Sequence, residues 1–194
     1  GPSKTEGAAD MKNLLGGKGA NLAEMCRLGI SVPPGLTIST EACTVYTEQG
    51  ADAVRQMIEA EVKAGVEFVE KEMGKKFGDS ADPLLVSVRS GSRASMPGMM
   101  DTILNLGLND EAVAGLTAKS GNERFAWDSY RRFIQMYGDV VMGLKPESKE
   151  EHDPFEVVID EIKEKKGVEL ETCLSVDDLK QMVAEFKALI KNRV

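Results

Sequence analysis

The sequence predicts an α+β protein whose C-terminal part is helical. Apolar residues recur every three or four positions over residues 54–73, as they do on one face of a long helix. Two short apolar runs, residues 84–88 and 102–106, have the length and the flanking proline or glycine of β-strands. From residue 109 onward the spacing of apolar residues is helical again. Strands are therefore expected only in the first part of the chain.

The N-terminal segment is expected to begin with a glycine turn. Residues 16–19 form this turn, which leads into a short helix over residues 20–28. After a proline-rich turn we expect a short strand over residues 36–39, and then a helix over residues 40–49. The long helix follows and is expected to end near Gly74.

The run over residues 84–88 is expected to be a buried strand, because it is short, apolar and bounded by Pro83 and a polar turn. Arg89 lies at its C-terminal end. Residues 90–101 are rich in glycine, serine and methionine, which favours a loop leading to the strand over residues 102–106. We expect residues 91–101 to form a flap that is mobile when no ligand is bound.

Three helix starts are predicted in the C-terminal part. Asn122 can cap a helix that carries an apolar stripe, and Asp153 followed by proline is typical of another N-terminus. Ser175 with Asp178 resembles a capping box. We therefore expect an α/β subdomain over residues 1–110 and a helical subdomain over residues 111–194.

Composition excludes several classes of function. The formal net charge of −8 argues against a broad surface for nucleic acid or anionic lipid. The three cysteines form no CxxC pair, and with only one histidine neither a disulfide framework nor a transition-metal site is indicated. That histidine, His152, lies in an acidic linker and is expected to be solvated rather than a phosphoryl carrier. No apolar run reaches membrane-spanning length.

The glycine turn is the first candidate for phosphate binding. Gly16-Gly17-Lys18-Gly19 before a helix can present backbone N–H groups and one ammonium to an anion. It is neither a Walker A loop, because Lys12 and Gly19 stand where glycine and serine or threonine are needed, nor a GxGxxG motif, because of Leu22. An ordinary tight turn with a solvated lysine remains the alternative.

Arg89 is the second candidate, because the C-terminal ends of strands are where open sheets commonly bind ligands. Its planar guanidinium suits phosphate, whereas Lys18 supplies a compact charge, so we expect the two side chains to converge on one anion site. A structural salt bridge is the alternative for Arg89. Of Arg131 and Arg132, adjacent on a helix, either is available for a phosphate or a carboxylate partner.

Four segments together resemble the pyruvate phosphate dikinase family. The resemblance is carried by residues 11–22, 87–93, 95–107 and 125–137, which include Met-Lys-Asn-Leu-Leu-Gly-Gly-Lys-Gly and Ser-Met-Pro-Gly-Met-Met-Asp-Thr. It implies that the chain is the N-terminal portion of an ATP-grasp-like nucleotide-binding domain with a helical subdomain. It also implies which residues contact ATP, namely Lys18, Arg89, Gly98, Met100, Asp101, Thr102 and, as a lesser candidate, Arg132.

The family's reaction converts ATP, phosphate and pyruvate to AMP, diphosphate and phosphoenolpyruvate. The resemblance implies that the phosphoryl-carrying histidine, the ligands of Mg²⁺ and the pyruvate site all lie outside this chain, which would then be inactive alone. It further implies a homo-oligomeric parent enzyme in the cytoplasm or the plastid stroma. The ATP domain of phosphoenolpyruvate synthase or a related dikinase, and a non-catalytic interaction module, are the alternatives.

Overall fold

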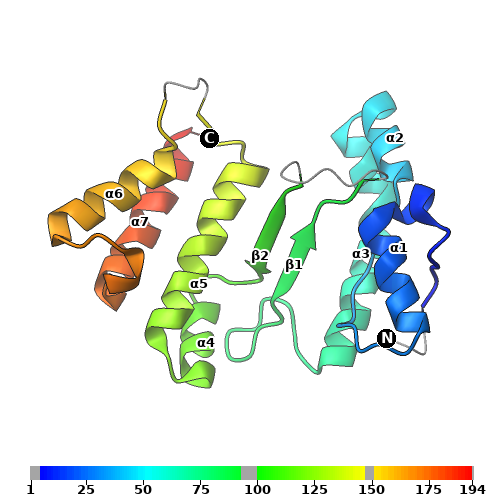
Figure 1. Ribbon diagram of the computed structural model, residues 1–194, viewed down its shortest axis with the longest axis horizontal. Helices are drawn as coiled ribbons and strands as arrows, with labels where there is room; N and C mark the ends of the chain where they lie inside the picture. The colour runs from blue at the N-terminus through cyan, green and yellow to red at the C-terminus, as the bar shows by residue number, and fades with distance from the viewer. Residues whose placement is uncertain (1–4, 93–99, 147–150, 194) are drawn as a thin grey trace. The chain divides into compact units, whose positions relative to one another are not determined.

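A computed structural model describes residues 5–92, 100–146 and 151–193 of the chain (Figure 1). Backbone contacts divide it into two compact units. Unit 1 contains the described residues of Gly1–Lys75 and Arg89–Met100, and unit 2 contains those of Lys76–Val88 and Asp101–Val194. Each unit is therefore treated by itself.

Unit 1 contains three helices, α1 (Lys12–Arg27), α2 (Glu41–Gln49) and α3 (Ala51–Met73). The predicted helices over residues 40–49 and 54–73 are confirmed, and α3 ends at Gly74 in the left-handed conformation that favours glycine. Helix α1 begins earlier than predicted, because one turn precedes a break at Gly16. Its backbone returns to helical geometry after that break.

The strand predicted over residues 36–39 is wrong. No strand forms there, since a strand needs a partner and the one sheet among the described residues pairs β1 (Val86–Arg89) with β2 (Thr102–Leu106). Thr40, which follows this segment, instead forms two hydrogen bonds to α1. Its amide donates to the Leu14 carbonyl at 2.8 Å, and its hydroxyl donates to the Asn13 carbonyl at 2.6 Å.

Unit 2 is built around α5 (Glu123–Met136), which packs against β2, α4 (Ala112–Ser120) and α7 (Val176–Arg193) (Figure 1). β2, which packs on this helix, and residues 86–88 of β1 group with the helical part of the chain, whereas Arg89 belongs to unit 1. This division differs from the boundary predicted near residue 110. The α+β class is confirmed in the form of helices with a two-stranded sheet.

The predicted burial of β1 is wrong. Burial ends at Leu84, just before the strand, and Val88 within it is 47% exposed. A strand buried on both faces needs a helix on each side, and among the described residues α5 packs against β2, the partner of β1. The strand at residues 102–106 is confirmed, and Ile103 is its buried residue.

The core of unit 2 lies between α5, α6 (Pro154–Lys166) and α7. Phe155 of α6 meets Phe186 of α7 edge to face, with ring centroids 4.9 Å apart. Helix α5 continues into a π-helical turn, η1 (Tyr137–Val141), and a Cβ added to Gly138 there would lie 2.3 Å from the Phe155 ring. Glycine is therefore required beside this phenylalanine.

The predicted helix starts are confirmed. The Asn122 side chain accepts a hydrogen bond from the Phe125 amide at 3.0 Å. The Asp153 carboxylate accepts bonds from the amides of Phe155 and Glu156 at 2.8 and 3.2 Å. These side chains satisfy amides that the first turn of a helix leaves without a partner.

The capping box of α7 is the most strongly charged of these starts. The Asp178 carboxylate accepts a bond from Lys166 at 2.7 Å, and from the Ser175 hydroxyl and amide at 2.6 and 2.9 Å. In return, the Ser175 hydroxyl accepts from the Asp178 amide at 3.3 Å. The Lys166 ammonium first, and then the Ser175 donors, lower the pKa of Asp178 to about 2.

The pH dependence of unfolding tests this capping box. Because folding lowers the pKa of Asp178, its stabilisation is complete above about pH 4 and is lost as the pH falls toward about 2. We expect Asp178→Asn to destabilise unit 2 at neutral pH and to remove part of this acid sensitivity. The measurement is urea unfolding followed by the fluorescence of Trp127, which lies in α5. The control is Asp177→Asn in the same helical turn; an equal effect from both variants would contradict the assignment.

Candidate functional site

The glycine turn of α1 is held against the segment that follows β1. Gly16 interrupts the helix with φ 68° and ψ 169°, a backbone conformation that is essentially restricted to glycine. The next amide, that of Gly17, donates to the Ser92 carbonyl at 3.0 Å. The Lys18 ammonium donates to the Ser90 carbonyl, also at 3.0 Å. Two motifs 72 positions apart in the sequence therefore meet within unit 1.

Arg89 directly precedes this contact. Consecutive Cα atoms are about 3.8 Å apart, so the bond from Lys18 to Ser90 brings the main chain at Arg89 near the glycine turn. Lys18 and Arg89 are both exposed. Neither forms an ion pair with a carboxylate in the part of the chain that the structure describes. Their positive charges are therefore available to an anion, and a shared anion stays a prediction.

The remaining residues of the predicted nucleotide loop are distributed between the two units. Gly98 and most of the predicted flap lie outside the described residues. Met100 is half-buried and belongs to unit 1. Asp101 is exposed, Thr102 begins β2, and both belong to unit 2. Their contacts with a nucleotide stay predictions.

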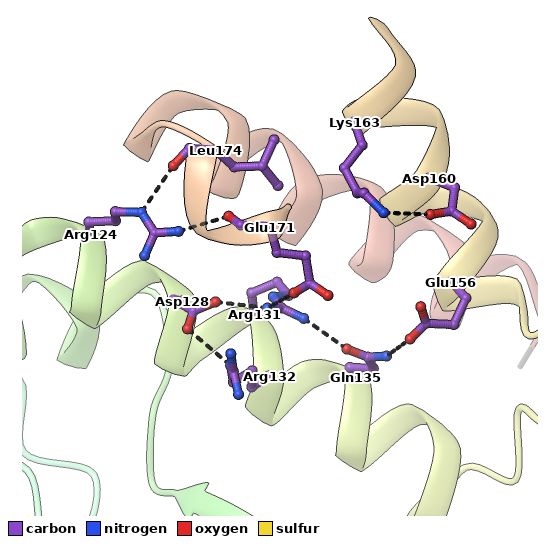
Figure 2. Close-up of polar contacts among 10 residues, drawn as sticks. All are labelled: Arg124, Asp128, Arg131, Arg132, Gln135, Glu156, Asp160, Lys163, Glu171 and Leu174. Carbon is purple, nitrogen blue, oxygen red and sulfur yellow. Dashed lines mark hydrogen bonds and ion pairs between the residues drawn. The ribbon is translucent and has the colours of Figure 1, made fainter. Parts of the chain in front are cut away.

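The two adjacent arginines of α5 have opposite environments (Figure 2). The Arg131 side chain is only 4% exposed, whereas that of Arg132 is 59% exposed. Asp128 contacts both, because one carboxylate oxygen accepts from the Arg131 Nη2 at 2.8 Å and the other accepts from the Arg132 Nε at 3.0 Å. Arg132 is therefore the arginine of this pair that solvent and ligands can reach.

Arg131 belongs to a polar network that connects α5 to η2 (Glu171–Cys173), and sequence reasoning did not find it (Figure 2). The Glu171 carboxylate accepts from Arg131 at 2.6 Å, and the Gln135 side chain accepts at 3.1 Å. Arg124 adds two bonds to the main-chain carbonyls of Glu171 and Leu174. The helical spacing held a signal, since Arg131 follows Trp127 by four positions and precedes Ile134 by three, on the packed face.

His152 is exposed, as predicted. In the described ranges, no group of three or more His, Cys, Asp or Glu side chains is placed to hold a metal ion. No helix in those ranges is long and apolar enough to cross a membrane.

A comparison with known protein families decides between the candidate families. Residues 12–157 match the family described as pyruvate phosphate dikinase, AMP/ATP-binding domain. The chain belongs to the pyruvate phosphate dikinase AMP/ATP-binding family. The matched region runs from the start of α1 into α6, and it contains the glycine turn, both strands and α5.

Individual relatives agree with this assignment. The chain is 59% identical over 186 residues to the pyruvate, phosphate dikinase of Clostridium symbiosum, covering 96% of the chain and 20% of that relative. It is 56% identical over 187 residues to the chloroplastic enzyme of Mesembryanthemum crystallinum, covering 96% of the chain and 19% of the relative. It is 52% identical over 191 residues to the Rhizobium meliloti enzyme, covering 98% and 20%.

The chain thus spans about a fifth of the length of the curated relatives that it matches. These relatives carry the name pyruvate, phosphate dikinase, which favours the dikinase reading over phosphoenolpyruvate synthase. They come from bacteria and from plants, and the plant relative is named as a chloroplastic enzyme. In this member of the family, the glycine turn contacts the main chain at Ser90 and Ser92, and a nucleotide site beside this contact stays a prediction.

The conformation of Gly16 can be tested by substitution. We expect Gly16→Ala to destabilise unit 1 by about 1–3 kcal/mol, because only glycine readily adopts its φ and ψ. Gly17→Ala is the matched control, since its Cβ would meet only the Ser92 carbonyl oxygen, at 3.9 Å. Circular dichroism is the appropriate probe, because Trp127, the only tryptophan, lies in unit 2. Equal stability of the two variants would show that the turn is not strained by a side chain at Gly16.

Proposed function

We propose that this chain is the N-terminal part of the ATP-binding domain of a pyruvate phosphate dikinase. The complete enzyme would convert ATP, phosphate and pyruvate to AMP, diphosphate and phosphoenolpyruvate, using a histidine outside this chain to carry the phosphoryl group. The observation that supports a phosphate site here is the contact between Lys18 and Ser90, in a chain that belongs to an AMP/ATP-binding family.

The glycine turn supplies two kinds of donor to a phosphate. The Gly17 amide and the Lys18 ammonium already donate to carbonyl oxygens, so their direction is set. A phosphate oxygen carries more negative charge than a carbonyl oxygen, and bonds to ionised acceptors are about twice as strong as neutral ones. An entering phosphate can therefore compete for these donors. This competition makes the free energy of phosphate binding less favourable, because the bonds to the two carbonyl oxygens are lost when phosphate binds.

Arg89 complements Lys18 in this proposal. Its guanidinium can make two parallel bonds to phosphate, whereas the ammonium acts as a compact charge. The remaining proposed nucleotide contacts are Gly98, Met100, Asp101, Thr102 and Arg132. A methionine provides an adaptable apolar surface for a purine, and a threonine hydroxyl provides a donor.

The proposed enzyme also uses Mg²⁺ with ATP and forms a homo-oligomer. Kinase-type sites hold Mg²⁺ with one or two carboxylates together with the phosphates of the nucleotide. We propose, from the family resemblance, that the carboxylates that bind Mg²⁺ lie outside this chain. Bound with ATP, the ion would neutralise phosphate charge during transfer, and Lys18 and Arg89 would hold the phosphates in position.

The first test is ATP binding by the chain itself. We expect binding to be weak and to weaken further as salt is raised, because the proposed donors are exposed and water competes for each charged bond. We also expect no phosphoenolpyruvate from pyruvate, phosphate, ATP and Mg²⁺. Calorimetry at low and high ionic strength and a product assay measure both. Tight, salt-insensitive binding would mean that the site is already complete, and turnover would refute the proposal that the phosphoryl carrier lies elsewhere.

The second test is substitution of the proposed phosphate ligands. Lys18→Ala and Arg89→Ala should each weaken ATP binding about tenfold, the value of one exposed charged hydrogen bond, and should leave adenosine binding unchanged. Lys12→Ala in α1 and Arg55→Ala in α3 are matched controls, because they remove the same charges from unit 1. An equal loss of ATP affinity in the control variants would mean that only the overall charge of unit 1 matters. Wild-type ATP affinity in both Lys18→Ala and Arg89→Ala would exclude the proposed phosphate site.

A further inference from the structure

Arg132 presents one side of its guanidinium to solvent. Its Nε donates to the Asp128 Oδ2 at 3.0 Å, and its side chain is 59% exposed. In the part of the chain that the structure describes, the two terminal nitrogens, Nη1 and Nη2, donate no hydrogen bond to a carboxylate or carbonyl. These two nitrogens form the end of the fork, which can make two parallel bonds to the oxygens of one phosphate.

Asp128 is itself held from the interior of unit 2 (Figure 2). Its Oδ1 accepts from Arg131, whose side chain is 4% exposed and cannot move without leaving the core. Glu171 accepts from the same Nη2, and Gln135 accepts from the Nη1 of that buried guanidinium. The order of contacts is therefore Glu171 to Arg131, Arg131 to Asp128, and Asp128 to Arg132.

The charges in this series leave Arg132 cationic toward solvent. The single negative charge of Asp128 is shared between two guanidinium groups, one on each carboxylate oxygen. Glu171 contacts Arg131 and not Arg132. Arg132 is thus oriented by a carboxylate that does not fully neutralise it.

Stability alone does not account for the outer pair. Arg132 and Asp128 form an exposed ion pair four positions apart on one helix, and such pairs contribute little to folding. Its definite consequence is geometric, since the Nε bond fixes the plane of the guanidinium. Fixing a long side chain before a ligand arrives reduces the entropy that is lost on binding.

We propose that Asp128, anchored by buried Arg131, is a positioning residue that orients the Arg132 guanidinium to bind a phosphate group of the nucleotide. The inference rests on the proposed function and extends it to the support of one ligand. Asp128 touches no phosphate itself, because its two oxygens face the arginines.

A double-mutant cycle on the whole chain tests this role. ATP is the probe, and its affinity is measured by NMR titration, which suits weak binding, for wild type, Asp128→Asn, Arg132→Ala and the double variant. We expect Asp128→Asn to weaken ATP binding by about two- to tenfold, the cost of ordering one long side chain. It should cause no further loss when Arg132 is already alanine. Adenosine, which lacks phosphate, should bind all four proteins equally.

The sign of the Asp128 effect separates orientation from charge. Removing a carboxylate near an anion strengthens binding if charge alone matters, so tighter ATP binding by Asp128→Asn would overturn the inference. A loss that persists in the Arg132→Ala background would also overturn it, since the effect would then not act through Arg132. Asp160→Asn is the control, because it removes a carboxylate from another helical ion pair of unit 2, that with Lys163.

A second variant, Arg132→Lys, tests the same role if Asp128→Asn disturbs the buried network around Arg131. This exposed substitution preserves the charge but removes the Nε bond and the fork. We expect it to lose about as much ATP affinity as Arg132→Ala; wild-type affinity would overturn the inference. Weakened binding in Lys18→Ala and Arg89→Ala with unchanged binding in all Arg132 variants would reject only the positioning role. Unchanged binding in all of these variants would reject the proposed function as well.

Discussion

The burial of one guanidinium, that of Arg131, determines how unit 2 is assembled. A buried positive charge is costly unless carboxylates and hydrogen-bond acceptors surround it, and α5 can supply only Asp128 and Gln135 from its own turns. The third partner, Glu171, comes from the short helix η2, and Arg124 binds the main chain of the same segment. The connection between α6 and α7 is therefore fixed in place by the charge that α5 buries. The apolar contacts of Phe155 and Phe186 then close the core beside it.

Unit 1 depends on a different constraint, which is a backbone conformation. The break at Gly16 turns the Gly17 amide toward the Ser92 carbonyl and the Lys18 side chain toward the Ser90 carbonyl. A continuous helix would have used the Gly17 amide internally, in the regular bond to the fourth preceding carbonyl. The turn thus exchanges one helical bond for a connection between two motifs that carry positive side chains. This connection lies inside the region that matches the dikinase AMP/ATP-binding family, and it is where we propose a phosphate site.

Features set by neighbouring residues were predictable from the sequence. Asn122, Asp153 and the pair of Ser175 with Asp178 act within one turn of their own positions, so residue type alone identified them. Features that need a distant partner were not. The segment over residues 36–39 has strand-like composition, but Thr40, which follows it, bonds to the carbonyls of Asn13 and Leu14 in a helical turn rather than to a strand. The partner of Arg131 is 40 positions away, and no periodicity specifies it. Lys18 and Arg89 were predicted as phosphate ligands from the chemistry of their side chains, and the structure adds the contact between their segments.

The fit of Gly138 against Phe155 couples two positions that lie on opposite sides of the α5 to α6 connection. The ring fills the space that any side chain at residue 138 would need. Neither position can change freely by itself, because a larger residue at 138 requires a smaller one at 155, and a smaller residue at 155 leaves a void beside glycine. Among related sequences these two sites should therefore be inherited as a pair, and a larger residue at 138 should mark a lineage in which Phe155 had already been exchanged for a smaller residue.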